Sequence, residues 1–211
     1  MNPNPYGDDI YREPANVDPD TLANLGPLAR LAGRWQGTRG VDVNPKAGGP
    51  ETAGYTETID LEPIDPQANG PQLLYGLRYH QHVLKPGEAA TFHDQVGYWL
   101  WEPATGTLYQ TLSIPRAQSA LAMGHAAADA SRFELVAKRG ATVNGIVSGP
   151  FLEEAFRTLE YRIEVTLNAD GSWSYRQDTV LAVRGRAEPF HHTDRDTLVR
   201  IAAPVPNPLA R

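Results

Sequence analysis

The most distinctive polar motif in the sequence is Arg-Tyr-His-Gln-His at residues 78–82, inside a segment with the alternation of a β-strand. Residues two apart on a strand share a face, so Arg78, His80 and His82 project to one side. Two imidazoles about 7 Å apart along a strand can bind one metal ion. His80 and His82 are therefore candidate metal ligands, and His82 with Glu88 could form part of a cupin-like set. The alternative is a solvent-facing side of the sheet, the usual antiparallel pattern.

A second group of histidines and aspartates lies near the end of the chain, where residues 190–198 read FHHTDRDTL. Adjacent residues on a strand face opposite sides, so only one of His191 and His192 can point inward. A neutral imidazole is a common ligand of iron and zinc, and Asp194 or Asp196 could accept a hydrogen bond from its other ring nitrogen. The motif predicts a metal ligand here, and a polar surface loop is the alternative.

Large aromatic side chains alternate along two other strand-like segments. Trp99 and Trp101 share one face with His93, and Tyr175 shares a face with Trp173. Such positions can line a ligand cavity, or they can simply fill a core with bulky side chains.

Trp35 directly follows a short helical pattern and begins a long series of strand patterns. In a small closed barrel, a Trp on the first strand can close one end, and a cation from the last strand can lie over its ring. We therefore predict a cation–π contact between Arg200 and Trp35, worth about 0.5–2 kcal/mol.

The elements that must position these residues are mostly strands. Residues 21–32 show helical spacing interrupted at Gly26-Pro27, and after Gly33 the hydrophobic period changes from 3.6 to 2. The clearest strand is Leu159–Leu167, which ends at the turn sequence Asn-Ala-Asp-Gly. About ten short, hairpin-linked strands predict an all-β antiparallel barrel with a short N-terminal helix, since closure removes the sheet edges.

Composition and charge restrict the function classes. The 211 residues suit one core, and we expect a tail at 1–20, a barrel at 21–203 and a Pro-rich tail at 204–211. A net charge of −6 without a basic run argues against nucleic-acid binding.

The chain has no Cys and no apolar segment long enough to span a membrane as a helix, so we expect a cytoplasmic protein with no membrane partner. Its Pro-rich end could dock on a second copy in a homodimer.

Three motifs together resemble one known family. Leu31–Gly37 reads LAGRWQG, His93–Trp99 reads HDQVGYW, and the last strand carries His191 and His192. In order and local motif these residues resemble the nitrobindin-like, fatty-acid-binding-protein-like haem-binding β-barrels, over roughly residues 25–203. The resemblance implies a calycin-like (lipocalin-like) barrel of ten strands that binds haem b through a C-terminal His.

The resemblance also implies residue roles and an activity. His192 or His191 would be the haem iron ligand, and Arg39, Arg78, His80 and His82 are candidates for propionate or distal contacts. Trp99, Trp101 and Tyr175 would line the pocket. Haem-binding members of this family react with nitric oxide and isomerise peroxynitrite to nitrate. The alternatives are a non-enzymatic carrier of a small hydrophobic ligand and a mononuclear metal-binding barrel using His80 and His82.

Overall fold

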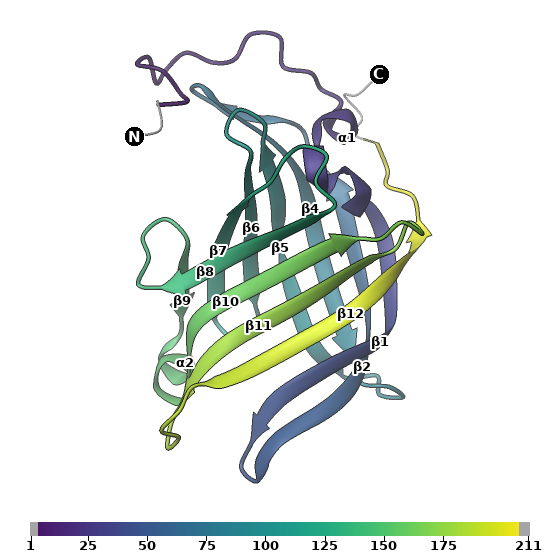
Figure 1. The fold of residues 1–211 in the computed structure, drawn as a ribbon, viewed down its shortest axis with the longest axis vertical. Coiled ribbons are helices and arrows are strands. Elements are labelled where there is room, and N and C mark those ends of the chain that lie inside the picture. Colours follow the sequence, from purple (N-terminus) through teal and green to yellow (C-terminus); the bar gives the residue numbers. More distant parts are fainter. Residues whose placement is uncertain (1–3, 207–211) are drawn as a thin grey trace.

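The computed structural model describes residues 4–206, which form one β-barrel with two short helical segments at one end and a third helix before β10 (Figure 1). The strands are β1 (Gly33–Lys46), β2 (Gly49–Pro63), β3 (Gln67–Asn69), β4 (Gln72–Leu84), β5 (Thr91–Glu102), β6 (Thr107–Ile114), β7 (Gln118–His125), β8 (Arg132–Arg139), β9 (Gly145–Ser148), β10 (Phe156–Leu167), β11 (Trp173–Val183) and β12 (Phe190–Ala202). The helices are α1 (Thr21–Asn24), the 3-10 helix η1 (Gly26–Leu31) and α2 (Pro150–Ala155).

The sheet closes on itself because β2 pairs with both β1 and β4. The order around the ring is β2-β1-β12-β11-β10-β8-β9-β7-β6-β5-β4, and β3 pairs only with β4 outside it. Among the described strands, β8 and β9 are the parallel pair, and the other pairings are antiparallel. The predicted all-β antiparallel barrel is therefore confirmed.

The strand count differs slightly from the expectation of about ten, because the ring contains eleven of the twelve strands. β3 and β9, of three and four residues, were not predicted. Strands this short carry too few alternations for a period of two to show. The long strands follow their pattern well: Tyr161, Ile163 and Val165 on β10 are buried inside the barrel.

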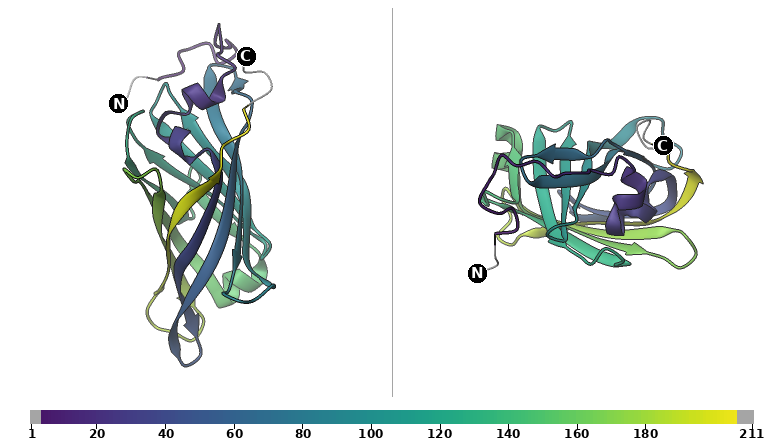
Figure 2. Two further views of the ribbon diagram at one scale, coloured as in Figure 1. Left: turned by 90° about the vertical axis from the view of Figure 1, so that its right-hand side faces the viewer. Right: turned by 90° about the horizontal axis from the view of Figure 1, so that it is seen from above.

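The N-terminal helices close one end of the barrel, which we call the capped end (Figure 2). The Asp20 side chain accepts a hydrogen bond from the Ala23 amide at 3.1 Å and caps α1. Gly26, at φ +54°, begins η1, and its Cα lies against the Trp101 ring. Leu25, Leu28 and Leu31 are fully buried and fill this end of the barrel.

Trp35 completes the capped end. Its indole Nε1 donates to the Leu31 carbonyl at 2.7 Å, and the Arg200 guanidinium lies 4.7 Å from the centre of its ring. The predicted cation–π contact is therefore confirmed.

The segment before α1 contains no helix or strand from residue 4 to residue 20. It is anchored where the Tyr6 hydroxyl donates to Glu102 at 2.8 Å. Parts of both expected tails, residues 1–3 and 207–211, lie outside the described residues. Within residues 4–206, the helices are all too short to cross a bilayer.

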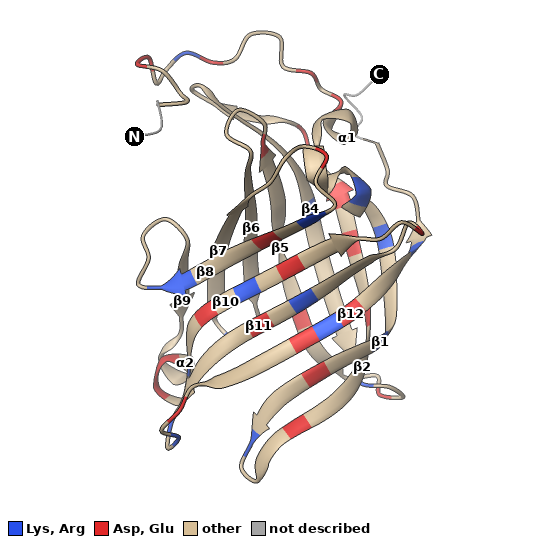
Figure 3. Ribbon diagram, viewed as in Figure 1, with Lys and Arg blue, Asp and Glu red and all other residues tan. Residues whose placement is uncertain are grey.

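Acidic and basic residues lie near one another on several neighbouring strands (Figure 3). Arg162 on β10, for example, pairs with Glu134 on β8 at 2.5 Å and with Glu160 at 2.8 Å. Exposed pairs of this kind contribute little stability each. The distribution of charge inside the barrel is more informative.

Candidate functional site

The last strand carries polar residues into the barrel at the end opposite α1 and η1. Alternation on β12 places His192, Asp194 and Asp196 on the inner face and His191 on the outer face. His191 Nδ1 lies 2.7 Å from Asp178, and its side chain is 62% exposed. The structure therefore separates the two histidines that the sequence left as alternatives.

His192 lies within a compact group of carboxylates. Its Nε2 is 2.7 Å from Asp42 Oδ1 and 3.8 Å from Asp194 Oδ2. Asp42 is the partner of Asp194 in the β1–β12 register, which explains how a residue 150 positions earlier reaches the histidine. Asn44 Nδ2 donates to Asp42 Oδ2 at 2.5 Å, and Gln177 Nε2 donates to Asp194 Oδ2 at 3.1 Å.

The surroundings shift the protonation of this group. Burial opposes ionisation of Asp42, but hydrogen bonds from His192 and Asn44 outweigh burial and lower its pKa. Burial favours neutral His192, yet the bond to Asp42 and the nearby Asp194 raise the pKa of the imidazole. Burial raises the pKa of Asp194 to about 7 against the attraction of His192. These shifts favour an ion pair between ionised Asp42 and protonated His192, beside the Asp194 carboxyl, whose pKa is about 7.

A second pair of buried carboxyl groups, Glu57 on β2 and Asp196 on β12, lies deeper in the same interior. Glu57 accepts hydrogen bonds from the Tyr175 hydroxyl at 2.9 Å and from Gln81 Nε2 at 2.6 Å. Burial raises the pKa of Glu57 to about 8 and also raises that of Asp196. When Glu57 and Asp196 are both ionised, no described residue donates a hydrogen bond to Asp196 Oδ2. A protonated Glu57 carboxyl would supply that donor.

A glycine makes the position of Asp196 possible. A Cβ on Gly37 would lie 2.1 Å from Asp196 Oδ2, so only glycine lets the carboxyl approach β1 this closely. The pairing of β1 with β2 shifts its register between Gly37 and Gly40, as at a β-bulge. Arg39 lies in this irregular stretch, and its side chain is exposed.

We call the region formed by Asp42, Glu57, His192, Asp194 and Asp196 the polar end. No Lys or Arg among residues 4–206 is buried, so these four carboxyl groups have no guanidinium or ammonium partner inside the barrel, although the exposed Arg39 lies near enough to Asp196 to favour its ionised form. The inward imidazoles are those of His192 and His93, and burial lowers the pKa of His93. The polar end therefore has an excess of acceptors and of potential negative charge.

The predicted residues of β4 lie on the other side of the sheet. Arg78 pairs with Glu62 at 2.6 Å, His80 with Asp94 at 2.8 Å, and the His82 ring with the Thr91 hydroxyl at 2.9 Å. Tyr75, Leu77 and Tyr79 occupy the inner positions of this strand, and Glu88 is exposed in the β4–β5 turn. The interior does not bring Arg78, His80 or His82 together with His192.

The predicted aromatic residues do point inward. Trp99, Trp101 and Tyr175 are each at most 5% exposed. Trp101 lies beneath Gly26 at the capped end, whereas Tyr175 contacts Glu57 and shares a 2.7 Å hydrogen bond with Tyr55.

Sequence reasoning missed Asp42, Glu57 and Gln81. One signal was available for Glu57, which occupies an inward position in the alternating series Tyr55, Glu57, Ile59 and Leu61. A charged residue in the apolar phase of a strand is a candidate for a functional site. Asp42 had no comparable signal, because the irregularity after Gly37 changes the phase of β1.

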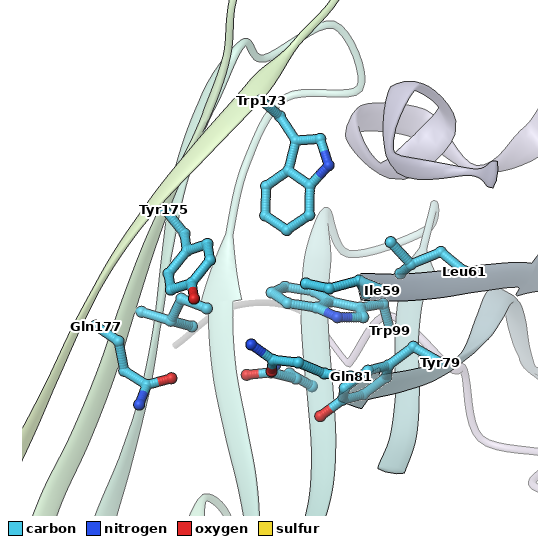
Figure 4. A pocket seen from close by; sticks show the side chains of 10 residues that line it. Ile59, Leu61, Tyr79, Gln81, Trp99, Trp173, Tyr175 and Gln177 are labelled. Carbon is cyan, nitrogen blue, oxygen red and sulfur yellow. The ribbon is translucent and has the colours of Figure 1, made fainter. Parts of the chain in front are cut away.

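Side chains largely fill the interior between the two ends. Figure 4 shows Trp99, Trp173 and Tyr175 converging on a cavity that Gln81 and Gln177 border from the polar end. The cavity has a volume of about 20 Å³, room for roughly one water molecule. The Trp173 indole nitrogen, also buried, has no hydrogen-bond partner among the described residues.

These residues do not fit the haem that the sequence resemblance implies. Pockets for ligands of drug size have volumes of about 300–1,000 Å³, and the 20 Å³ cavity would enlarge to that size only if several aromatic rings moved. In addition, His192 Nε2 faces the Asp42 carboxylate at 2.7 Å. Carboxylates and amides surround this imidazole, where a porphyrin would require an apolar slot.

Comparisons with known proteins agree on the fold. The structure of Rv2717c from M. tuberculosis matches with a TM-score of 0.62 and 19% identity, covering 87% of this chain and 99% of that chain. At this identity, the likeness shows the fold alone. No curated protein sequence matches the chain. A family model described as "THAP4-like, heme-binding beta-barrel domain" matches residues 24–200, which confirms the resemblance found in the motifs. The chain therefore belongs to the THAP4-like haem-binding β-barrel domain family.

Proposed function

We propose that this barrel binds a small, positively charged ligand at its polar end and that haem is not its ligand. The observation that supports the proposal is the charge balance of the interior. Asp42, Glu57 and Asp196 are at most 6% exposed, and no buried Lys or Arg accompanies them in residues 4–206. Removing an ion from water costs several kcal/mol unless a partner compensates. A cation would provide the compensation that protons on Glu57 and Asp194 otherwise provide.

The polar end offers hydrogen-bonding groups that suit a cationic ligand, and solvent can reach them. Asp194 and Asp196 offer acceptors, and the amides of Gln81 and Gln177 offer both donors and acceptors. The His192 side chain is 32% exposed, so solvent reaches the site. A carrier of an apolar ligand would instead need an apolar cavity larger than the 20 Å³ one between Trp99, Trp173 and Tyr175.

The competing function is haem-dependent handling of nitric oxide or peroxynitrite, with His192 as the iron ligand. The observation in its favour is that His192 points inward on the last strand and that Asp42 orients its ring at 2.7 Å. The volume and the acidity of the interior count against it.

A haemin titration separates the two functions. We expect no saturable one-to-one change in absorbance near the Soret region with wild-type protein, His192→Ala or His191→Ala. The outward His191 is the matched control. A one-to-one Soret shift that disappears in His192→Ala and persists in His191→Ala would contradict the proposal and establish the haem function.

Thermal unfolding provides the positive test. Putrescine and agmatine at pH 8 should raise the melting temperature more than succinate at equal ionic strength, because bound ligand stabilises the folded state. The difference should shrink in Asp194→Asn. Equal effects of the cations and succinate would count against a cationic ligand.

A further inference from the structure

We infer that Asp42, His192 and Asp194 form a binding site for one divalent first-row metal ion. This inference rests on the proposed function, since it names the class of cation that the polar end binds. One potential ligand atom from each of the three side chains lies within 4.8 Å of the other two. These are two carboxylate oxygens and an imidazole nitrogen, the ligand types that such ions take in proteins.

The spacing of the three atoms suits a metal ion. Ligand atoms about 2.1 Å from a metal ion stand roughly 3–3.5 Å apart. His192 Nε2 lies 2.7 Å from Asp42 Oδ1 and 3.8 Å from Asp194 Oδ2, one value on each side of that range. Small side-chain movements would bring the three atoms, which lie within 4.8 Å of one another, to a common centre.

The backbone and two amides hold the group in place. The β1–β12 register sets Asp42 opposite Asp194, and His192 precedes Asp194 by two residues on the same face. Asn44 donates to Asp42 Oδ2 and Gln177 donates to Asp194 Oδ2, which orients both carboxylates as outer-shell partners do in metal sites. Asp42 is 1% exposed, whereas His192 is 32% exposed on its side chain, so the group is anchored inside and reachable from solvent.

Asp196 lies beside the group, at the next inward position on β12, and is 6% exposed. Consecutive inward side chains on a strand are about 7 Å apart. Its Oδ2 lies against Gly37 and pairs with Glu57, so this carboxyl adds negative charge next to the ion without joining its ligands.

The ligand set also selects among metal ions. With one nitrogen, two oxygens and no Cys in the chain, the site favours Mn²⁺, Fe²⁺ or Zn²⁺ over Cu⁺. On the outer face, His80 contacts Asp94 at 2.8 Å and His82 contacts Thr91 at 2.9 Å.

The test is a titration of the full chain with Mn²⁺, in which electron paramagnetic resonance measures the free ion. We expect one bound Mn²⁺ per chain, displaced by Zn²⁺. Asp194→Asn should weaken binding at least tenfold, because it removes a charged ligand with little change in shape. His191→Ala, which alters the outward neighbour of His192, should bind as wild type does.

Circular dichroism checks that Asp194→Asn folds, and a second measurement does not depend on that variant. In the wild-type spectrum, Mn²⁺ should broaden the nuclear magnetic resonance signals of the His192 ring strongly and leave those of the exposed His80 ring sharp. No saturable binding, or equal broadening of both rings, would overturn the inference. If amines stabilise the protein and Mn²⁺ does not bind, the metal inference is wrong and the proposed function stands. A haemin complex that depends on His192 would instead show that the proposed function is wrong.

Discussion

Glu57 shows how one buried residue ties stability to pH. Its carboxyl is 2% exposed and accepts hydrogen bonds from Tyr175 and Gln81, yet burial dominates and raises its pKa to about 8. The ordinary value is 4.5. Between these two values the folded protein holds a proton that the unfolded chain has released.

Stability should therefore fall as pH rises from about 4.5 to 8, and Glu57→Gln should flatten this dependence. The amide cannot ionise, so the variant loses the contribution of this carboxyl in that window, and the smaller one from Asp194 remains. Urea unfolding at pH 5, 6, 7 and 8 measures the slope. Glu62→Gln, on the exposed outer face, is the control and should keep the wild-type slope. Identical slopes in wild type and Glu57→Gln would show that the carboxyl is ionised in the folded state.

At the scale of elements, the site depends on how closely β1 and β12 approach each other. Gly37 permits this approach, because its Cα packs directly against the Asp196 carboxyl. The register shift between Gly37 and Gly40 then returns Asp42 to the inner face of β1. A strand without that irregularity would present a different set of residues to His192.

Gly37→Ala should destabilise the protein by about 1–3 kcal/mol, the usual cost of overpacking. Its new Cβ would lie 2.1 Å from Asp196 Oδ2 and 3.2 Å from the Glu57 side chain, so the carboxyl must move. Gly54→Ala is a matched control in β2, where a Cβ would meet nothing closer than 3.9 Å. Chemical denaturation compares the two. Equal stability of the two variants would mean that Asp196 shifts at no cost.

At the scale of the whole molecule, the capped end holds the apolar residues that stabilise the barrel, and the polar end holds the groups proposed to bind the ligand. Leu25, Leu28 and Leu31 close the capped end beside Trp35, and no charged side chain of the polar end reaches them. The aromatic residues around the central cavity separate the two ends. Stability and ligand binding should therefore respond to different substitutions.

Leu28→Ala should lower the free energy of unfolding by about 2–5 kcal/mol, because it leaves a cavity under η1. Mn²⁺ affinity should stay within about twofold of wild type. Val147→Ala, at a site that is 73% exposed, is the control for truncating an apolar side chain. Urea unfolding and the Mn²⁺ titration test both parts. A large loss of Mn²⁺ affinity in folded Leu28→Ala would show that the two ends are coupled.

The sequence by itself determined the fold class, and it determined which neighbouring residues of a strand point to opposite faces of the sheet. A hydrophobic period of two leaves little choice but strands, and many hairpin turns favour an antiparallel barrel, as the structure has. The same period required His191 and His192 to face opposite sides. The contact of Arg200 with Trp35 also followed from their places on the last and first strands.

Only the tertiary structure decided which face is inside and what meets there. Alternation within one strand allows either phase, and the phase is resolved when neighbouring strands bury their apolar sides together. That is why Tyr79 is inside and His80 outside, and why His192 rather than His191 points inward. Asp42 comes from 150 residues away through the β1–β12 register, a long-range pairing that no local spacing encodes.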